Sequence, residues 1–172
     1  MKIIIACLFL VLLGCRQPEN KKTTQTETWT IGPFVKSDSL NPILLPDTSQ
    51  LFTCPLSQQK VNWESRNVLN PAAVVKDGKV YLLYRAQDQF MTSRIGLAIS
   101  DDGLHFIKQP EPVFYPSNDS MMAYEWKGGV EDPRIVEEAS GRYILTYTAY
   151  DGKTARLCLA SSLDLLHWQK HG

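Results

Sequence analysis

The sequence lacks the features that mark nucleic-acid-binding, metal-binding and helical proteins. Lysine and arginine balance aspartate and glutamate at 18 each among 172 residues, and no basic run occurs, so nothing predicts binding to nucleic acid. The three histidines and four cysteines do not stand at the spacing of metal ligands, and we expect no metal and no cofactor. No stretch keeps a helical period, which argues against a helical fold.

No apolar run is long enough to span a bilayer comfortably, but one near the N-terminus has another meaning. Lys2 precedes the run IIIACLFLVLL, and the following LLGC places a glycine directly before Cys15. This pattern resembles a bacterial lipoprotein signal with its lipobox, in which Cys15 becomes the lipidated first residue of the mature chain. The alternative is an ordinary secretory signal in which Cys15 has no role.

The segment after this signal is polar, and residues 16–28 are predicted to be a flexible tether. Together, residues 1–15 and the tether indicate an exported protein that is lipid-anchored to the bacterial cell envelope. An exported protein can form disulfides, but Cys158 lies in an apolar strand pattern. We therefore favour a buried free thiol at Cys158 over a bond with Cys54.

From residue 68 onward the chain has the pattern of a β protein. Short runs rich in β-branched, aromatic and aliphatic residues alternate with glycine-containing turns. The runs are KVYLLYRA, RIGLAIS, RYILTYTAY and ARLCLAS. Strands at such regular spacing predict an all-β sandwich, barrel or propeller.

An internal repeat decides among these folds. VLNPAAVVKDGKVYLLYRA, from Val68, aligns with VEDPRIVEEASGRYILTYTA, from Val130, at an offset of 62 or 63 residues. LAISDDGLHFIK then aligns with LASSLDLLHWQK. A repeat of about four strands is typical of a propeller blade, and the Ser, Asp, His and aromatic positions shared by both repeats are predicted to tie the outer hairpin of each blade.

The motif EWKGGVEDPRIV, residues 125–136, places two adjacent carboxylates at the entry to a strand. Successive side chains of a strand point to opposite faces, so we expect Asp132 to face the central channel and Glu131 not to. The repeat pairs Asp132 with Asn70, and Arg85 lies at the end of the next strand. These three side chains are predicted to converge, where amide, guanidinium and carboxyl groups suit a polyhydroxylated ligand.

Four segments resemble a known family: NPAAVVKDGKVYLLYRAQD, SRIGLAISDDGLHF, GGVEDPRI and YTAYDGKTARLCLASSLDLLHW. Over about residues 35–172 they are similar to the N-terminal part of glycoside hydrolase family 130, the β-mannoside phosphorylases and β-1,2-mannosidases. The resemblance implies a five-bladed β-propeller of which this chain covers about the first two blades. Blade one is placed at 68–129 and blade two at 130–172, within a domain that begins at Trp29.

The resemblance also assigns roles to individual residues. It implies that Asp132 is the general acid and that Asn70 and Arg85 contact the sugar. Glu131 and Arg134 of the same motif are further candidate substrate-binding residues. The expected ligand is a β-mannoside oligosaccharide.

We expect the whole protein to be an inverting glycosidase that hydrolyses β-mannosides, because phosphate is less reliably abundant outside the cytoplasm. One alternative is a β-mannoside phosphorylase, in which inorganic phosphate is a co-substrate and mannose 1-phosphate the product. Another is a noncatalytic lipoprotein that binds glycans. Five blades need a chain about twice as long, so the sequence is expected to be a fragment, or to be completed by another chain, and to be inactive alone.

Overall fold

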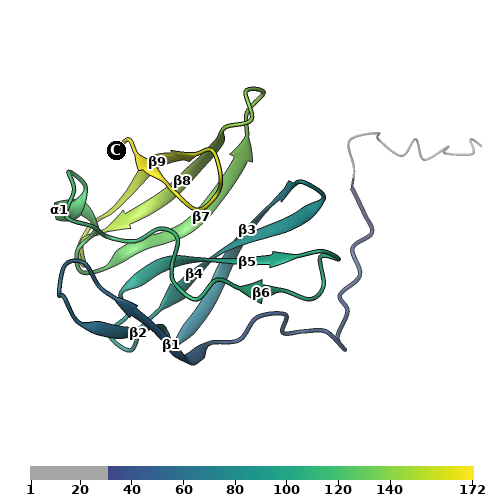
Figure 1. The fold of residues 1–172 in the computed structure, drawn as a ribbon, viewed down its shortest axis with the longest axis horizontal. Helices are drawn as coiled ribbons and strands as arrows, with labels where there is room; N and C mark the ends of the chain where they lie inside the picture. The colour runs from purple at the N-terminus through teal and green to yellow at the C-terminus, as the bar shows by residue number, and fades with distance from the viewer. Residues whose placement is uncertain (1–30) are drawn as a thin grey trace, which may run out of the picture. The chain divides into compact units, whose positions relative to one another are not determined.

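The computed structural model describes residues 31–172, of which Ser37–Gly172 form one compact unit (Figure 1). Cys15, the tether at 16–28 and the expected domain start at Trp29 lie outside the described residues. Between residues 31 and 172, no helix is both long and apolar enough to cross a membrane.

The compact unit is built almost entirely of antiparallel strands, as expected for an all-β fold. The elements are β1 (Asp47–Thr53), β2 (Lys60–Glu64), β3 (Asn67–Lys76), β4 (Lys79–Gln87), β5 (Ser93–Ser100), β6 (Ile107–Lys108), α1 (Met122–Glu125), β7 (Gly129–Glu137), β8 (Tyr143–Tyr150), β9 (Ala155–Ser162) and β10 (Gln169–Lys170). Apart from the single turn of α1, every described element is a strand.

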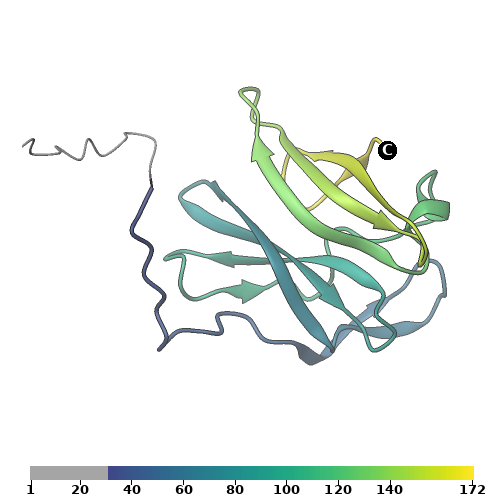
Figure 2. The ribbon, with the colours of Figure 1, turned by 180° about the vertical axis from the view of Figure 1, so that it is seen from behind.

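Strands β3 to β6 and strands β7 to β10 form two four-stranded antiparallel units, which we call repeat 1 and repeat 2. One parallel pair, Ser93 with Gly129, joins β5 to β7, and the two repeats diverge from that point (Figures 1 and 2). Gly129 has a φ of +108°, and a Cβ there would lie 2.1 Å from the Ser93 carbonyl oxygen. Glycine is therefore required where the repeats meet.

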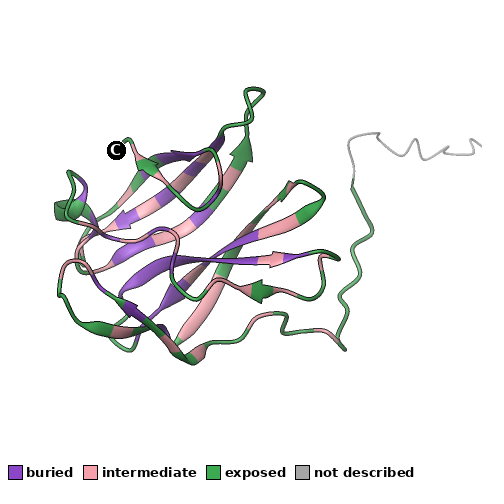
Figure 3. Ribbon diagram, in the orientation of Figure 1, coloured by how far each residue is buried: buried purple, intermediate pink, exposed green. Residues whose placement is uncertain are grey.

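The main core lies between the facing sides of the two repeats. Its fully buried members include Leu83, Ile95 and Leu97 of repeat 1 and Leu145 and Ala160 of repeat 2. Figure 3 shows the buried segments concentrated on β4, β5 and β8, whereas the hairpin tips are exposed. The first strands of the two repeats, β3 and β7, also contact each other.

A second core covers the other side of repeat 1. The hairpin of β1 and β2 supplies Phe52, Cys54 and Trp63, which pack with Tyr84 and Ala98 of repeat 1. The sequence pattern did not predict this hairpin, because it precedes the repeat and has no counterpart in it. Its Cys54 is buried and free.

Cys158 is also buried and free, which confirms the prediction of a free thiol. It lies on β9 among the residues of the main core, packed between the two repeats. Among the described residues, the two thiols therefore act as small apolar core groups rather than as a cross-link.

The outward side of repeat 2 carries apolar residues that the same side of repeat 1 buries. By the repeat, Ile95 and Leu97 correspond to Leu157 and Leu159. Ile95 and Leu97 are 0% exposed, because repeat 2 covers them, whereas Leu157 is 81% exposed and Leu159 36%. Repeat 2 therefore presents an open apolar sheet face.

Candidate active site

Two β-bulges at equivalent positions in the repeats place Asn70 and Asp132. The pairing register shifts between Leu69 and Ala72 in β3 and between Glu131 and Arg134 in β7. Asn70 has a φ of +48° and Asp132 one of +49°. Asparagine and aspartate tolerate this left-handed conformation better than other residues with side chains, and a bulge turns a side chain away from the strand's alternation.

The two bulges direct their side chains toward each other. Asn70 Nδ2 donates a hydrogen bond to Asp132 Oδ1 at 2.5 Å, across 62 residues of sequence. Arg85 Nη1 donates to the same oxygen at 3.1 Å. Asn70, Arg85 and Asp132 therefore meet, as the repeat predicted. Within residues 31–172, no side chain or backbone group donates a hydrogen bond to Asp132 Oδ2.

Glu131 also contacts this group, although regular strand alternation would send its side chain to the face opposite that of Asp132. Both carboxylates reach one guanidinium, since Arg85 Nη2 donates to Glu131 Oε1 while Nη1 donates to Asp132. The bulge at Asp132 breaks the alternation that would have sent the two side chains to opposite faces. They differ in exposure instead: the Glu131 side chain is 14% exposed and that of Asp132 38%.

The surroundings of Glu131 disfavour its charged form. Burial raises the pKa of Glu131 above its ordinary value, and the neighbouring charge of Asp132 adds to the rise. The Arg85 guanidinium and the Ser93 hydroxyl act in the opposite direction. A buried carboxyl that already has two partners is poorly placed to contact a sugar.

Three further polar side chains, which the sequence pattern did not single out, extend the group inward. Ser93 Oγ donates to Glu131 Oε1 at 3.0 Å and accepts hydrogen bonds from Arg85 Nε at 3.0 Å and from Gln87 Nε2 at 3.2 Å. Asn67 Nδ2 donates to the Gln87 side chain at 2.9 Å. A continuous network therefore runs from the interior of repeat 1 to the half-buried Asp132.

Arg134 does not join this network. It is exposed on β7, and its guanidinium donates to the carbonyl oxygen of Pro133 at 2.7 Å. The structure thus brings together Asp132 and three of the four residues predicted to accompany it, whereas Arg134 bonds its neighbour's backbone instead.

Two buried Tyr–Glu–Lys clusters are other places where ionisable groups gather. Tyr84 and Lys108 of repeat 1 donate hydrogen bonds to Glu64 of β2, at 3.0 Å each. In repeat 2 Tyr147 donates to Glu125 at 2.8 Å, and Lys170 donates at 2.5 Å. Glu64 and Glu125 are both 0% exposed. Because each repeat forms such a cluster with a fully buried glutamate from the segment before it, these groups belong to the fold.

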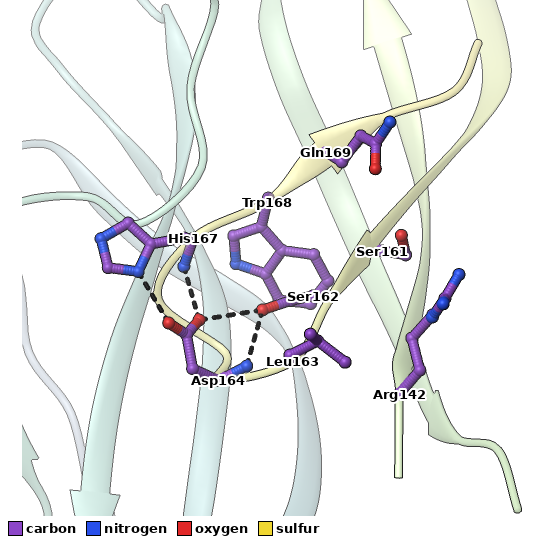
Figure 4. A pocket seen from close by; sticks show the side chains of 8 residues that line it. All are labelled: Arg142, Ser161, Ser162, Leu163, Asp164, His167, Trp168 and Gln169. Carbon is purple, nitrogen blue, oxygen red and sulfur yellow. Dashed lines mark hydrogen bonds and ion pairs between the residues drawn. The ribbon is translucent and has the colours of Figure 1, made fainter. Parts of the chain in front are cut away.

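A pocket of about 460 Å³ lies on repeat 2, away from the network (Figure 4). Asp164 in its lining accepts hydrogen bonds from Ser162 Oγ at 3.1 Å and from the His167 backbone, and its carboxylate contacts His167 Nδ1 at 2.7 Å. These contacts close the turn from β9 to β10 and occupy the Asp164 carboxylate. It has no free acid and is not the candidate site.

Repeat 1 has the same turn, made by Ser100, Asp102 and His105. The hydrogen bond with the His105 side chain and those with nearby backbone amides lower the pKa of Asp102. The prediction that these repeated residues tie the outer hairpins is confirmed. Between residues 31 and 172, no cluster of three or more His, Cys, Asp or Glu residues could hold a metal ion.

Comparisons with known proteins identify a family whose model matches the chain and several relatives. The model of glycoside hydrolase family 130, described as beta-1,4-mannooligosaccharide phosphorylase, matches residues 38–172. A 1,2-beta-oligomannan phosphorylase of Thermoanaerobacter sp. (strain X514) is 32% identical over 148 residues, which are 80% of this chain and 44% of that protein.

Two solved structures are more similar in sequence. A glycosyl hydrolase from Bacteroides ovatus matches with a TM-score of 0.81 and 42% identity, over 84% of this chain and 42% of that one. A second structure matches with a TM-score of 0.82 and 44% identity, over 84% of this chain and 42% of that one. It comes from work showing that the family of mannoside phosphorylases contains glycoside hydrolases that target beta-1,2 mannosidic linkages in Candida mannan. The chain spans less than half the length of each relative.

Proposed function

The chain belongs to glycoside hydrolase family 130, and on that premise we propose that it carries the acid half of an inverting site that cleaves β-mannosides, with Asp132 as the general acid. One observation carries the proposal. Asn70 and Arg85 both donate hydrogen bonds to Oδ1 of Asp132. The Asp132 carboxylate is also more exposed than that of Glu131. The other oxygen is left to carry a proton toward a leaving group.

Asn70 and Arg85 are proposed to bind the sugar as well as the acid. Asn70 is exposed, and Arg85 lies between the two repeats with its side chain 16% exposed. Amide and guanidinium groups hydrogen-bond the hydroxyls of a sugar, and both groups already point at the acid. A mannoside that replaced one of their contacts to Asp132 would lie within reach of the proton.

We propose hydrolysis rather than phosphorolysis as the reaction. The structure described as a glycosyl hydrolase is 42% identical to the chain, and the one from work on glycoside hydrolases of the family is 44% identical, whereas the phosphorylase relative is 32% identical. The alternative is a phosphorylase, in which phosphate replaces water as the nucleophile. An inverting hydrolase needs a base about 6.5 to 9.5 Å from the acid, and a phosphorylase needs cations that bind phosphate.

We assign neither the base nor the phosphate-binding cations to a described residue. The five-bladed propeller implied by the family would supply them from other blades, so we expect residues 1–172 alone not to turn over β-mannosides. Activity is therefore to be measured with the full-length protein that contains these residues.

Product analysis tests the proposal. The full-length protein is incubated with β-1,2-mannobiose, with and without inorganic phosphate, and the sugars are followed by NMR. Release of free mannose in the α configuration, whether or not phosphate is present, is the result expected of an inverting hydrolase. Mannose 1-phosphate as product identifies the phosphorylase. Sugar binding without any cleavage supports the noncatalytic alternative.

The proposed location is the bacterial cell envelope, through a lipid on Cys15. This rests on the sequence pattern alone, because Cys15 lies outside the described residues. Expression in a bacterial host with labelled fatty acid tests it: the wild type is expected to incorporate the label and the Cys15→Ser variant to lose it. Soluble secretion of unlabelled wild-type protein would contradict the lipobox interpretation.

A further inference from the structure

We propose that Ser93 and Glu131 are positioning residues, which fix the guanidinium of Arg85 so that its Nη1 faces Asp132. The inference rests on the proposed function, because it gives Asp132 and Arg85 their roles. It changes the role of Glu131 from a sugar ligand to a residue that acts through Arg85, and it gives Ser93 a role that the sequence pattern did not suggest.

The guanidinium of Arg85 is held on three sides. Its Nε donates to Ser93 Oγ, its Nη2 to Glu131 Oε1 and its Nη1 to Asp132 Oδ1. A planar guanidinium presents its donors in fixed directions, so two bonds within its plane determine where the third donor points. The bonds to Ser93 and Glu131 therefore aim Nη1 at the acid.

The two residues that hold Arg85 are not available to a substrate. Ser93 is 0% exposed, and the Glu131 side chain is 14% exposed. Ser93 Oγ already bonds Arg85, Gln87 and Glu131. Their polar groups face the guanidinium and each other, as expected of side chains that support a site from behind.

The backbone of Ser93 is fixed to the strand that carries the acid. Its amide donates to the carbonyl oxygen of Gly128 at 2.8 Å, and Ser93 pairs with Gly129 at the junction of the repeats. Asp132 follows three residues later on β7. The same contact that joins the repeats therefore sets the distance between Ser93 and the acid.

Comparing the two repeats shows which residues both sets of strands share and which residues occur only in the network around Arg85. The cross-strand pair Ala86–Arg94 of repeat 1 corresponds to the pair Ala149–Arg156 of repeat 2, with both residue types kept. By the same register, Arg85, Gln87 and Ser93 correspond to Thr148, Tyr150 and Ala155, and Glu131 corresponds to Leu69. Repeat 2 forms its strands without a hydroxyl at the Ser93 position, so that hydroxyl serves something other than the repeat.

Hydrogen exchange of the Arg85 side chain tests the proposal without relying on activity. In the ¹⁵N-labelled chain, the Nε–H signal of Arg85 is identified by its loss in Arg85→Lys. Ser93→Ala removes the acceptor of this hydrogen, and Glu131→Gln removes the negative charge of the group that accepts from Arg85 Nη2. We expect each variant to speed the exchange about fivefold or more, as the loss of one net hydrogen bond implies.

Two matched variants control for general loosening. Ser161→Ala removes a buried hydroxyl from repeat 2, and Glu137→Gln removes an exposed carboxylate from β7. Both are expected to leave Arg85 exchange at the wild-type rate. Wild-type exchange in Ser93→Ala and Glu131→Gln would overturn the proposal. If Ser93→Ala does not fold, Glu131→Gln decides by the same criterion.

Kinetics of the full-length protein distinguish positioning from sugar binding. Displacing Arg85 is expected to lower kcat about 10- to 100-fold in both variants, with a smaller rise in KM because Arg85 is also proposed to contact the sugar. A raised KM at unchanged kcat would instead make Ser93 or Glu131 a sugar contact and overturn the proposal. If the wild type cleaves no mannoside, the proposed function fails, and Arg85 exchange still decides whether the two residues position it.

Discussion

Asn70 Nδ2 donates to Asp132 Oδ1 at 2.5 Å from a bulge that repeats the one holding Asp132, 62 residues earlier in the chain. Both residues have a positive φ, and a proline follows each. The same β-bulge therefore occurs in both repeats, but it carries different side chains: the amide of Asn70, which donates, and the carboxylate of Asp132, which accepts. A carboxylate held by a neutral donor and by Arg85 has a defined orientation before any sugar arrives.

The free energy of unfolding should depend on pH in part through the titration of Glu131. Burial raises its pKa above the ordinary value of 4.5. A carboxyl with a raised folded pKa stabilises the fold below its unfolded pKa, and that contribution is lost as pH rises through the folded pKa. Glutamine does not titrate, so the unfolding free energy of Glu131→Gln minus that of the wild type should increase from about pH 4 to about pH 7.

Urea unfolding at several pH values measures this difference. The test is the direction in which this difference changes with pH, because its absolute size also includes the effect of altering the hydrogen bond to Arg85. A difference that stays level or decreases over the same range would contradict a raised pKa for Glu131.

The Tyr–Glu–Lys cluster of repeat 2 should be essential for stability. Lys170 pairs with Glu125, which is 0% exposed, and Lys170→Met would leave that carboxylate buried without its cation. Breaking a buried ion pair from one side costs about 3 to 5 kcal/mol. We expect a loss of this size in the free energy of unfolding, measured with urea.

Lys153→Met is the control, since Lys153 is exposed, and it should change the unfolding free energy by less than about 0.5 kcal/mol. Adding Glu125→Gln to Lys170→Met should recover part of the loss, because the amide carries no charge. A loss below about 1 kcal/mol for Lys170→Met would show that the cluster is not a coupled ion pair.

The open apolar face of repeat 2 should drive self-association of the chain. Leu157 is 81% exposed, and Leu157→Thr should reduce association in analytical ultracentrifugation while changing stability by less than about 0.5 kcal/mol. The equivalent Ile95 is fully buried, so Ile95→Thr should destabilise the fold by about 1 to 3 kcal/mol. Equal effects of the two substitutions on stability would contradict the difference in burial.

The meeting of Asn70, Arg85 and Asp132 could be predicted because a repeat fixes which positions are equivalent in space. Glu131 could not be placed by alternation, since alternation assumes a regular strand and a bulge interrupts it at the next residue. One signal was available: both bulges carry an Asn-Pro or Asp-Pro pair, which is typical of turns and irregular backbone. The same pair at both strand entries was reason to doubt a regular strand there.

The residues behind the site were missed for a different reason. Ser93 and Gln87 look like ordinary strand residues, and their role depends on contacts between strands that the sequence does not display. Comparing the repeats position by position would have marked them, because Ala155 and Tyr150 replace them in repeat 2. Glu64 and Glu125 were missed because they lie in segments that precede the aligned repeats.

The central claim, that Asp132 delivers the proton, is tested most directly by the turnover of Asp132→Asn in the full-length protein with β-1,2-mannobiose. An amide keeps the shape and the bonds of the side chain but cannot supply the proton, so kcat should fall about 10²- to 10⁴-fold while the sugar still binds. Asp77→Asn is the control, since Asp77 is exposed and has a similar φ of +50°; it should keep wild-type turnover. Wild-type kcat in Asp132→Asn on every β-mannoside that the protein cleaves would contradict the claim.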